Sequence, residues 1–122
     1  MTPIYNSARR FQFWSYIVSH GTLVIRSPLS SYEDQTTNID LIFFGVTELH
    51  LVRYFDGLTL SKADDILDEP HSKRFLIQSD ESTYFVEAFA VSAFENQLDT
   101  FEFYHPVNGP GDIGQRIAHS SG

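Results

Sequence analysis

The sequence contains no cysteine, and this absence excludes several kinds of chemistry. Without a thiol the chain can form no disulfide bond, no thiolate zinc site and no cysteine nucleophile. No segment approaches the roughly 20 apolar residues of a membrane-spanning helix. Residues 1–14 hold no apolar run of signal-peptide length. We therefore expect a protein of the reducing cytoplasm.

Positive charge is also scarce. Eight Lys and Arg residues stand against 16 Asp and Glu residues, which gives a formal net charge of −8. Such a chain is repelled by nucleic-acid phosphates and by anionic membranes. The expected partner is therefore another protein, of basic character. The alternative is that the excess acid serves only solubility.

Motifs of the common catalytic mechanisms are missing as well. The chain has no G-x-S-x-G nucleophile elbow and no P-loop. Gly109, Gly111 and Gly114 lie in a C-terminal tail, without the strand–helix context that a dinucleotide-binding fingerprint requires. These observations favour a non-catalytic protein with no cofactor.

Apolar residues, by contrast, are plentiful: they make up 42% of the chain, and 11 of them are Phe. They alternate with period two, which predicts a mainly β fold. We expect about seven or eight strands in a curved antiparallel sheet that forms a barrel or a two-layer sandwich. Residues 1–106 are expected to form one β-rich domain, and the Gly- and Pro-containing residues 107–122 a flexible tail. The expected strands cover residues 11–19, 22–27, 38–44, 46–55, 58–60, 74–79, 83–94 and 100–106.

One helix is predicted, at residues 62–69. Ser61 followed by Asp64 resembles a capping box, and Asp64 and Asp65 would lie in the positive first turn. Pro70 would end this helix.

Acidic residues are concentrated around the predicted helix, and this patch is the candidate surface for a basic partner. Exposed tyrosines would supply anchors for such an interface. The candidate partner-binding residues are Asp56, Asp64, Asp65, Asp68, Glu69, Tyr54 and Tyr104.

Glu48 and His50 form a second candidate site, because residues two apart share one face of a strand. Such a pair can ligate a metal or join an acid to a base. Two ligands do not make a metal site, and a third would have to come from elsewhere, such as Asp40. The alternative function is thus a small-ligand-binding protein or hydrolase with a barrel-mouth pocket near Glu48 and His50. A third alternative is a homo-oligomer, such as a dimer, paired through edge strands.

The segments SHGTLVIRSP at 19–28, NIDLIFFGVTELHL at 38–51 and FDGLTL at 55–60 carry a resemblance. Their pattern of apolar residues and turns resembles that of small uncharacterised bacterial proteins similar to the immunity proteins of polymorphic toxin systems. The resemblance implies a small, non-enzymatic cytoplasmic protein that binds and neutralises a toxin. No binding residue follows from it.

Overall fold

The computed structural model describes residues 2–30, 35–64, 67, 71–97 and 114–120. In this part of the chain, nine strands form one antiparallel sheet in the order β4-β7-β6-β5-β1-β2-β3-β8-β9. The end strands β4 and β9 are not paired with each other, so the described sheet is curved but not closed. No helix in these residues is long and apolar enough to cross a membrane. The elements are β1 (Thr2–Ile17), η1 (Val18–His20), β2 (Thr22–Ser27), β3 (Asn38–Phe44), β4 (Glu48–His50), β5 (Tyr54–Lys62), β6 (Lys73–Ser79), β7 (Ser82–Ala88), β8 (Ala90–Asn96) and β9 (Gln115–His119).

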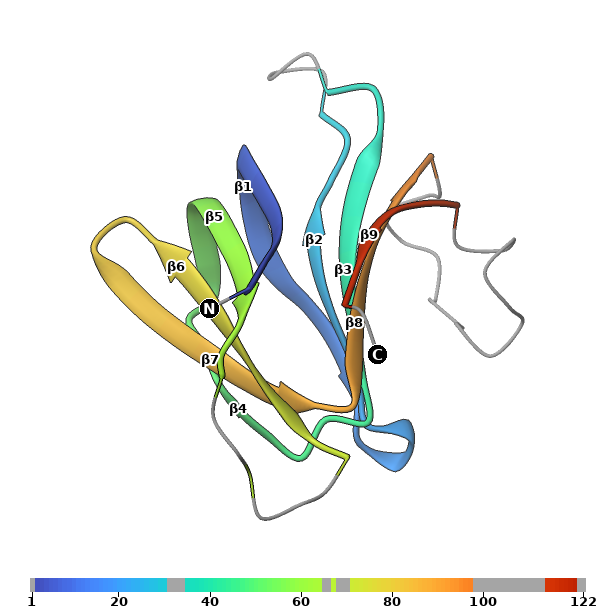
Figure 1. Ribbon diagram of the computed structural model, residues 1–122. Coiled ribbons are helices and arrows are strands. Elements are labelled where there is room, and N and C mark those ends of the chain that lie inside the picture. Colours follow the sequence, from blue (N-terminus) through green and yellow to red (C-terminus); the bar gives the residue numbers. More distant parts are fainter. Residues whose placement is uncertain (1, 31–34, 65–66, 68–70, 98–113, 121–122) are drawn as a thin grey trace.

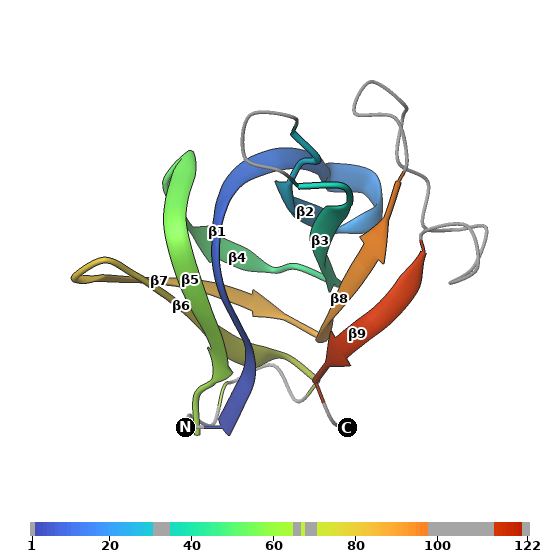
Figure 2. The ribbon, with the colours of Figure 1, turned by 90° about the horizontal axis from the view of Figure 1, so that it is seen from above.

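The long strand β1 connects the two halves of the sheet. It runs from the β5–β6–β7 side to the β2–β3–β8 side and bends on the way (Figures 1 and 2). Its pairing with β5 shifts register between Ser7 and Arg10, and such bulges bend a strand. Opposite this bulge, Gly57 of β5 has φ +74°, a conformation that side chains with a Cβ rarely adopt. β1 and β5 therefore bend together.

A corner at Phe89 makes the second connection between the halves. β7 pairs with β6, whereas β8, which begins one residue after Phe89, pairs with β3. The Phe89 amide donates a hydrogen bond of 2.8 Å to the Phe44 carbonyl, which fixes the corner. The single strand predicted at 83–94 is thus two strands separated by a bend.

The inner face of the curved sheet is the hydrophobic core. Phe11, Phe43, Phe55 and Phe75 are all at most 1% exposed there. The rings of Phe43 and Phe75 meet edge to face, with centroids 6.0 Å apart. Burying each such side chain stabilises the fold by about 1.5–3 kcal/mol. The Phe side chains that are so frequent in the sequence therefore fill the space enclosed by the curved sheet.

The mainly β, antiparallel fold predicted from the sequence is confirmed, most closely at β2, β3 and the β6–β7 hairpin. The predicted strands 22–27 and 38–44 have the bounds of β2 and β3. Each segment is a short apolar run, bounded by Gly21 and Pro28 or by polar residues and Gly45, which is typical of a strand buried on both faces. The strand expected at 100–106 lies outside the described residues.

The predicted helix at 62–69 is wrong for the residues of that segment that the structure describes. Lys62 ends β5, paired with Thr2 and Phe75, and the Ala63 amide donates to the Arg74 carbonyl at 2.9 Å. Strand pairing thus uses the backbone groups that the first helical turn would need. A helix this short gains too little to compete with that pairing. Asp64 and Leu67 are also non-helical, and residues 65–66 and 68–69 lie outside the described residues.

Other expectations also differ from the structure. The strand predicted at 11–19 is the second half of β1, and the one predicted at 46–55 contains β4 and the first two residues of β5. Asp56-Gly57 does not end a strand, because the bulge in β1 lets β5 continue through the bend at Gly57. The expected tail also contains strand β9, in which Ala118 is paired with Ala93 of β8. Glycines near the end of the chain suggested a tail, but a free strand edge on β8 pairs with this segment.

Candidate functional site

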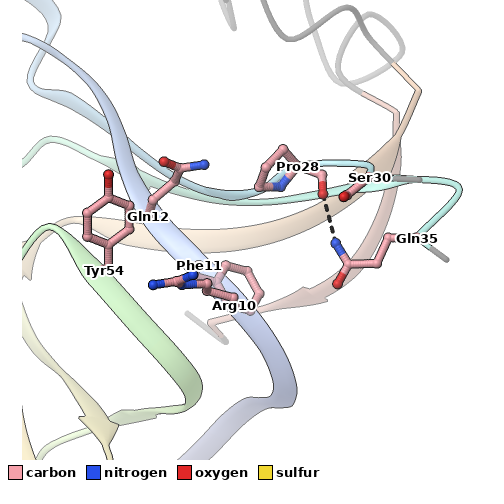
Figure 3. Close-up of a pocket in the computed structure, with 7 residues that line it drawn as sticks. All are labelled: Arg10, Phe11, Gln12, Pro28, Ser30, Gln35 and Tyr54. Atoms are coloured by element: carbon pink, nitrogen blue, oxygen red, sulfur yellow. Dashed lines mark hydrogen bonds between the residues drawn. The ribbon is translucent and has the colours of Figure 1, made fainter. Parts of the chain in front are cut away.

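The bend of β1 and β5 borders a pocket of about 420 Å³. One wall comes from three consecutive residues of β1 and from the first residue of β5. The opposite wall is formed by Pro28, Ser30 and Gln35, which follow β2 and precede β3 (Figure 3). Apolar and hydrogen-bonding groups both line the pocket, which is typical of a binding site. The lining residues are Arg10, Phe11, Gln12, Pro28, Ser30, Gln35 and Tyr54.

Tyr54 is the exposed aromatic residue of this pocket, with 48% of its surface accessible. The guanidinium carbons of Arg10 and Arg53 lie 5.3 Å and 5.4 Å from the centroid of its ring. Both distances are within the range of a cation–π interaction. In Figure 3 the Arg10 side chain extends toward Tyr54. Two positive groups are therefore held against one ring at the edge of the pocket.

The opposite wall is held by local hydrogen bonds. The backbones of Ser30 and Gln35 exchange two hydrogen bonds of 2.9 Å. The Gln35 side-chain amide donates to the Pro28 carbonyl at 2.8 Å (Figure 3), and the Leu29 amide donates to Asn38 Oδ1 at 2.8 Å. The described residues of this wall are thus bonded to one another and, through Leu29 and Asn38, to β3.

An acidic groove of about 360 Å³ adjoins the pocket. Asp56 and Asp80 supply its carboxylates, and Asp56 Oδ1 also lies 3.3 Å from Arg10 Nε. Asp80 has φ +55° in the β6–β7 turn, a conformation that Asp tolerates better than most residues. The pocket that Arg10 lines and the acidic groove that Asp56 lines therefore meet at the Arg10–Asp56 ion pair. The other lining residues are Asn6, Gly57, Leu58, Thr59, Gln78 and Ser79.

A buried polar network lies on the outer face of β2, β3 and β8. Arg26 donates two hydrogen bonds to the Asp40 carboxylate, at 2.6 Å and 2.9 Å, and stacks against Trp14 at 5.1 Å. Asn96 also donates to Asp40 at 2.9 Å and accepts from Asn38 at 2.9 Å. Since Asn38 also binds the Leu29 amide, the network supports the pocket wall from behind.

A second set of polar contacts links side chains of β1, β2 and β8 with Thr37. Arg9 donates to Ser27 Oγ at 3.0 Å, and Thr37 Oγ1 donates to Glu95 at 2.8 Å. Burial raises the pKa of the nearby Tyr5 hydroxyl above its ordinary value of 10.0. A hydrogen bond with Ser7 and the charge of Arg9 lower this pKa, and the charge of Glu95 raises it further. The phenol therefore stays protonated at neutral pH.

The structure brings two of the predicted partner-binding residues together. Tyr54 and Asp56 lie two residues apart on β5, both exposed, at the pocket and the groove. Asp64 is exposed but follows the other end of β5. Asp65, Asp68, Glu69 and Tyr104 lie outside the described residues.

The second predicted site, on strand β4, is an exposed contact between Glu48 and His50. His50 Nε2 lies 3.4 Å from Glu48 Oε2, and the His50 ring stacks on Phe85 with centroids 4.5 Å apart. Asp40, considered as a third ligand, is engaged by Arg26 instead. Among the described residues no group of three or more metal-ligating side chains is found.

Arg10, Gln35 and Asp80 are among the residues of the pocket and groove that the sequence did not indicate. Arg10 and Gln12 alternate with buried Phe11, so their exposure on β1 was readable from the pattern. Their position beside Tyr54 depends on the pairing of β1 with β5, which joins residues far apart in the chain. Asp80 lies in the turn between β6 and β7, and its place in the groove likewise depends on the pairing of distant strands.

Comparison with protein-family models, curated proteins and solved structures yields no match for this chain. The resemblance to immunity proteins stays a prediction.

Proposed function

We propose that this chain is a non-catalytic, cytoplasmic protein-binding module that recognises a basic protein, and immunity to a basic toxin is the most concrete form of that function. The observation that supports it best is the acidic groove of Asp56 and Asp80 beside the exposed Tyr54. A groove of about 360 Å³ has room for a Lys or Arg side chain of a partner. Carboxylates form charge-assisted hydrogen bonds with either.

Long-range electrostatics support the same assignment. The net charge of −8 attracts a basic protein and accelerates its association at low salt. Exposed ion pairs contribute only about 0.2–1 kcal/mol each. The remaining affinity has to come from an anchor, and Tyr and Arg are the residues enriched in such anchors. Tyr54, Arg10 and Arg53 supply both types next to the groove.

A selection from displayed random peptides tests this function. The immobilised wild-type protein should enrich peptides rich in Lys and Arg. The double variant Asp56→Asn with Asp80→Asn should bind them roughly tenfold more weakly at low salt, since two exposed ion pairs are lost. Tyr54→Ala should also weaken binding through loss of the anchor.

Glu48→Gln is the matched control, because it removes one exposed carboxylate from β4, outside the groove. It should change peptide binding by less than about twofold. Enrichment of neutral or acidic peptides, or equal binding by the Asp56/Asp80 double variant, would contradict the proposed function.

A further inference from the structure

We infer that the pocket between Tyr54 and the β2–β3 connection is a carboxylate-binding subsite, which receives an acidic side chain or C-terminal carboxylate of the partner beside an apolar group. This inference rests on the proposed function and deepens it. The partner would be basic as a whole and would insert one carboxylate next to the groove that holds its basic side chain.

Arg10, which lines the pocket, and Arg53, which lies beside it, have unused binding capacity. The Arg10 guanidinium lies over the Tyr54 ring and pairs with Asp56 through Nε, and the Arg53 guanidinium lies over the same ring. In the part of the chain that the structure describes, no further hydrogen bond or ion pair engages either guanidinium group. Guanidinium groups bind carboxylates with fixed geometry, often through two parallel hydrogen bonds.

Arg10 and Arg53 beside the Tyr54 ring, against the Asp56 carboxylate paired with Arg10, place one more positive than negative charge at this edge of the pocket. A carboxylate is attracted to that charge. Because Tyr54 holds both groups within 5.4 Å of its centroid, little side-chain entropy is lost when a carboxylate binds.

The remainder of the pocket suits the body of the ligand. Pro28 contributes apolar surface beside the Tyr54 ring, and Gln12 contributes an amide. In Figure 3, Gln12 and Tyr54 lie on the side of the pocket opposite Gln35, so a ligand would lie between them. A volume of about 420 Å³ accommodates a residue with a ring and its backbone.

Asp56 has opposite effects at the two subsites. In the groove its carboxylate attracts a basic group, whereas at the pocket it competes with the ligand for Arg10 Nε. Removing its charge should therefore weaken binding of basic peptides and strengthen binding of a carboxylate. A nonspecific loss of structure would weaken both.

The test compares N-acetyl-L-phenylalanine with N-acetyl-L-phenylalaninamide in NMR titrations of the folded wild-type chain. The two probes share the apolar body and differ in the carboxylate. The acid should shift amide signals of Arg10, Gln12 and Tyr54 saturably and bind roughly tenfold more tightly than the amide. Arg10→Gln should abolish this preference, and Asp56→Asn should increase it.

Lys73→Gln is the matched control, since Lys73 lies over the exposed Phe89 ring at 5.1 Å in a comparable cation–π pair away from the pocket. It should leave the preference unchanged. Equal binding of acid and amide, shifts at other residues, or no saturable shift would overturn the carboxylate subsite. None of these outcomes bears on the selection of basic peptides, so the two proposals can fail separately.

Discussion

The outer face of β2–β3–β8 and the bend of β1–β5 use the same three residue types in different surroundings. Each has an arginine, an aspartate and an aromatic ring: Arg26, Asp40 and Trp14 on the outer face, and Arg10, Asp56 and Tyr54 at the bend. The side chains of Arg26 and Asp40 are 2% and 0% exposed, whereas those of Arg10 and Asp56 are 59% and 69% exposed.

Burial decides what each group of residues can do. Inside the protein, the cost of removing charges from water is offset only by complete hydrogen bonding, so Asp40 is fully engaged by Arg26 and Asn96. At the surface, water screens the charges and the pair contributes little to stability. The exposed side chains at the bend can therefore exchange partners, whereas the buried network on the outer face supports the opposite wall of the pocket.

The largest effect is expected from breaking the buried group. Asp40→Ala leaves the Arg26 charge buried without its carboxylate and should lower the free energy of unfolding by about 3–5 kcal/mol. Urea denaturation measures this loss. Replacing both partners, as Arg26→Met with Asp40→Leu, should recover a large part of it, because no charge then remains buried. If Asp40→Ala lowered the free energy of unfolding by less than about 1 kcal/mol, the buried pair would behave like an exposed one, which would contradict the difference between the two regions.

The exposed group should respond in the opposite way. Asp56→Asn should change the free energy of unfolding by less than about 1 kcal/mol, because both side chains of the ion pair are mostly in water. The same denaturation experiment measures it. A loss as large as that for Asp40→Ala would show that the bend is structural and would remove the distinction between the two regions.

The smallest effect is expected at Tyr5, whose surroundings are intermediate between these two. Because burial raises its native pKa above the ordinary 10.0, the native state keeps its proton after the unfolded chain has lost it. Its contribution to stability is thus complete below pH 10 and is lost as pH rises through the native pKa. Compared with Tyr5→Phe, the wild type should lose stability only in this alkaline range. Parallel pH profiles of the two proteins would contradict the effect.

Local sequence patterns predicted some parts of this molecule well. Strands β2 and β3 were predicted with their bounds, because each is a short apolar run that ends at a glycine, a proline or polar residues and is buried on both faces. The capping signal at Ser61 failed, since pairing of β5 with β1 and β6 outweighs the stability of a short helix. Strand β9 was missed, because nothing in its own composition indicates the free edge of β8 that it pairs with.

The candidate site was predicted only in part. The sequence identified Tyr54 and Asp56 as surface residues suited to binding, and the pattern of β5 places them on one face. It did not indicate Arg10, Gln35 or Asp80, which come from three other parts of the chain. Their meeting depends on strand register, and register is a property of pairs of strands.

By itself, the sequence determined an acidic, cysteine-free, Phe-rich antiparallel β protein, because composition and alternation act locally along the chain. The tertiary structure alone decided which charges meet. Cross-strand pairing buried Arg26 against Asp40, while the bend in β1 left Arg10 exposed beside Tyr54. The physical reason is that the energy of a charge depends on its distance from water and from other charges, and only the folded chain sets those distances.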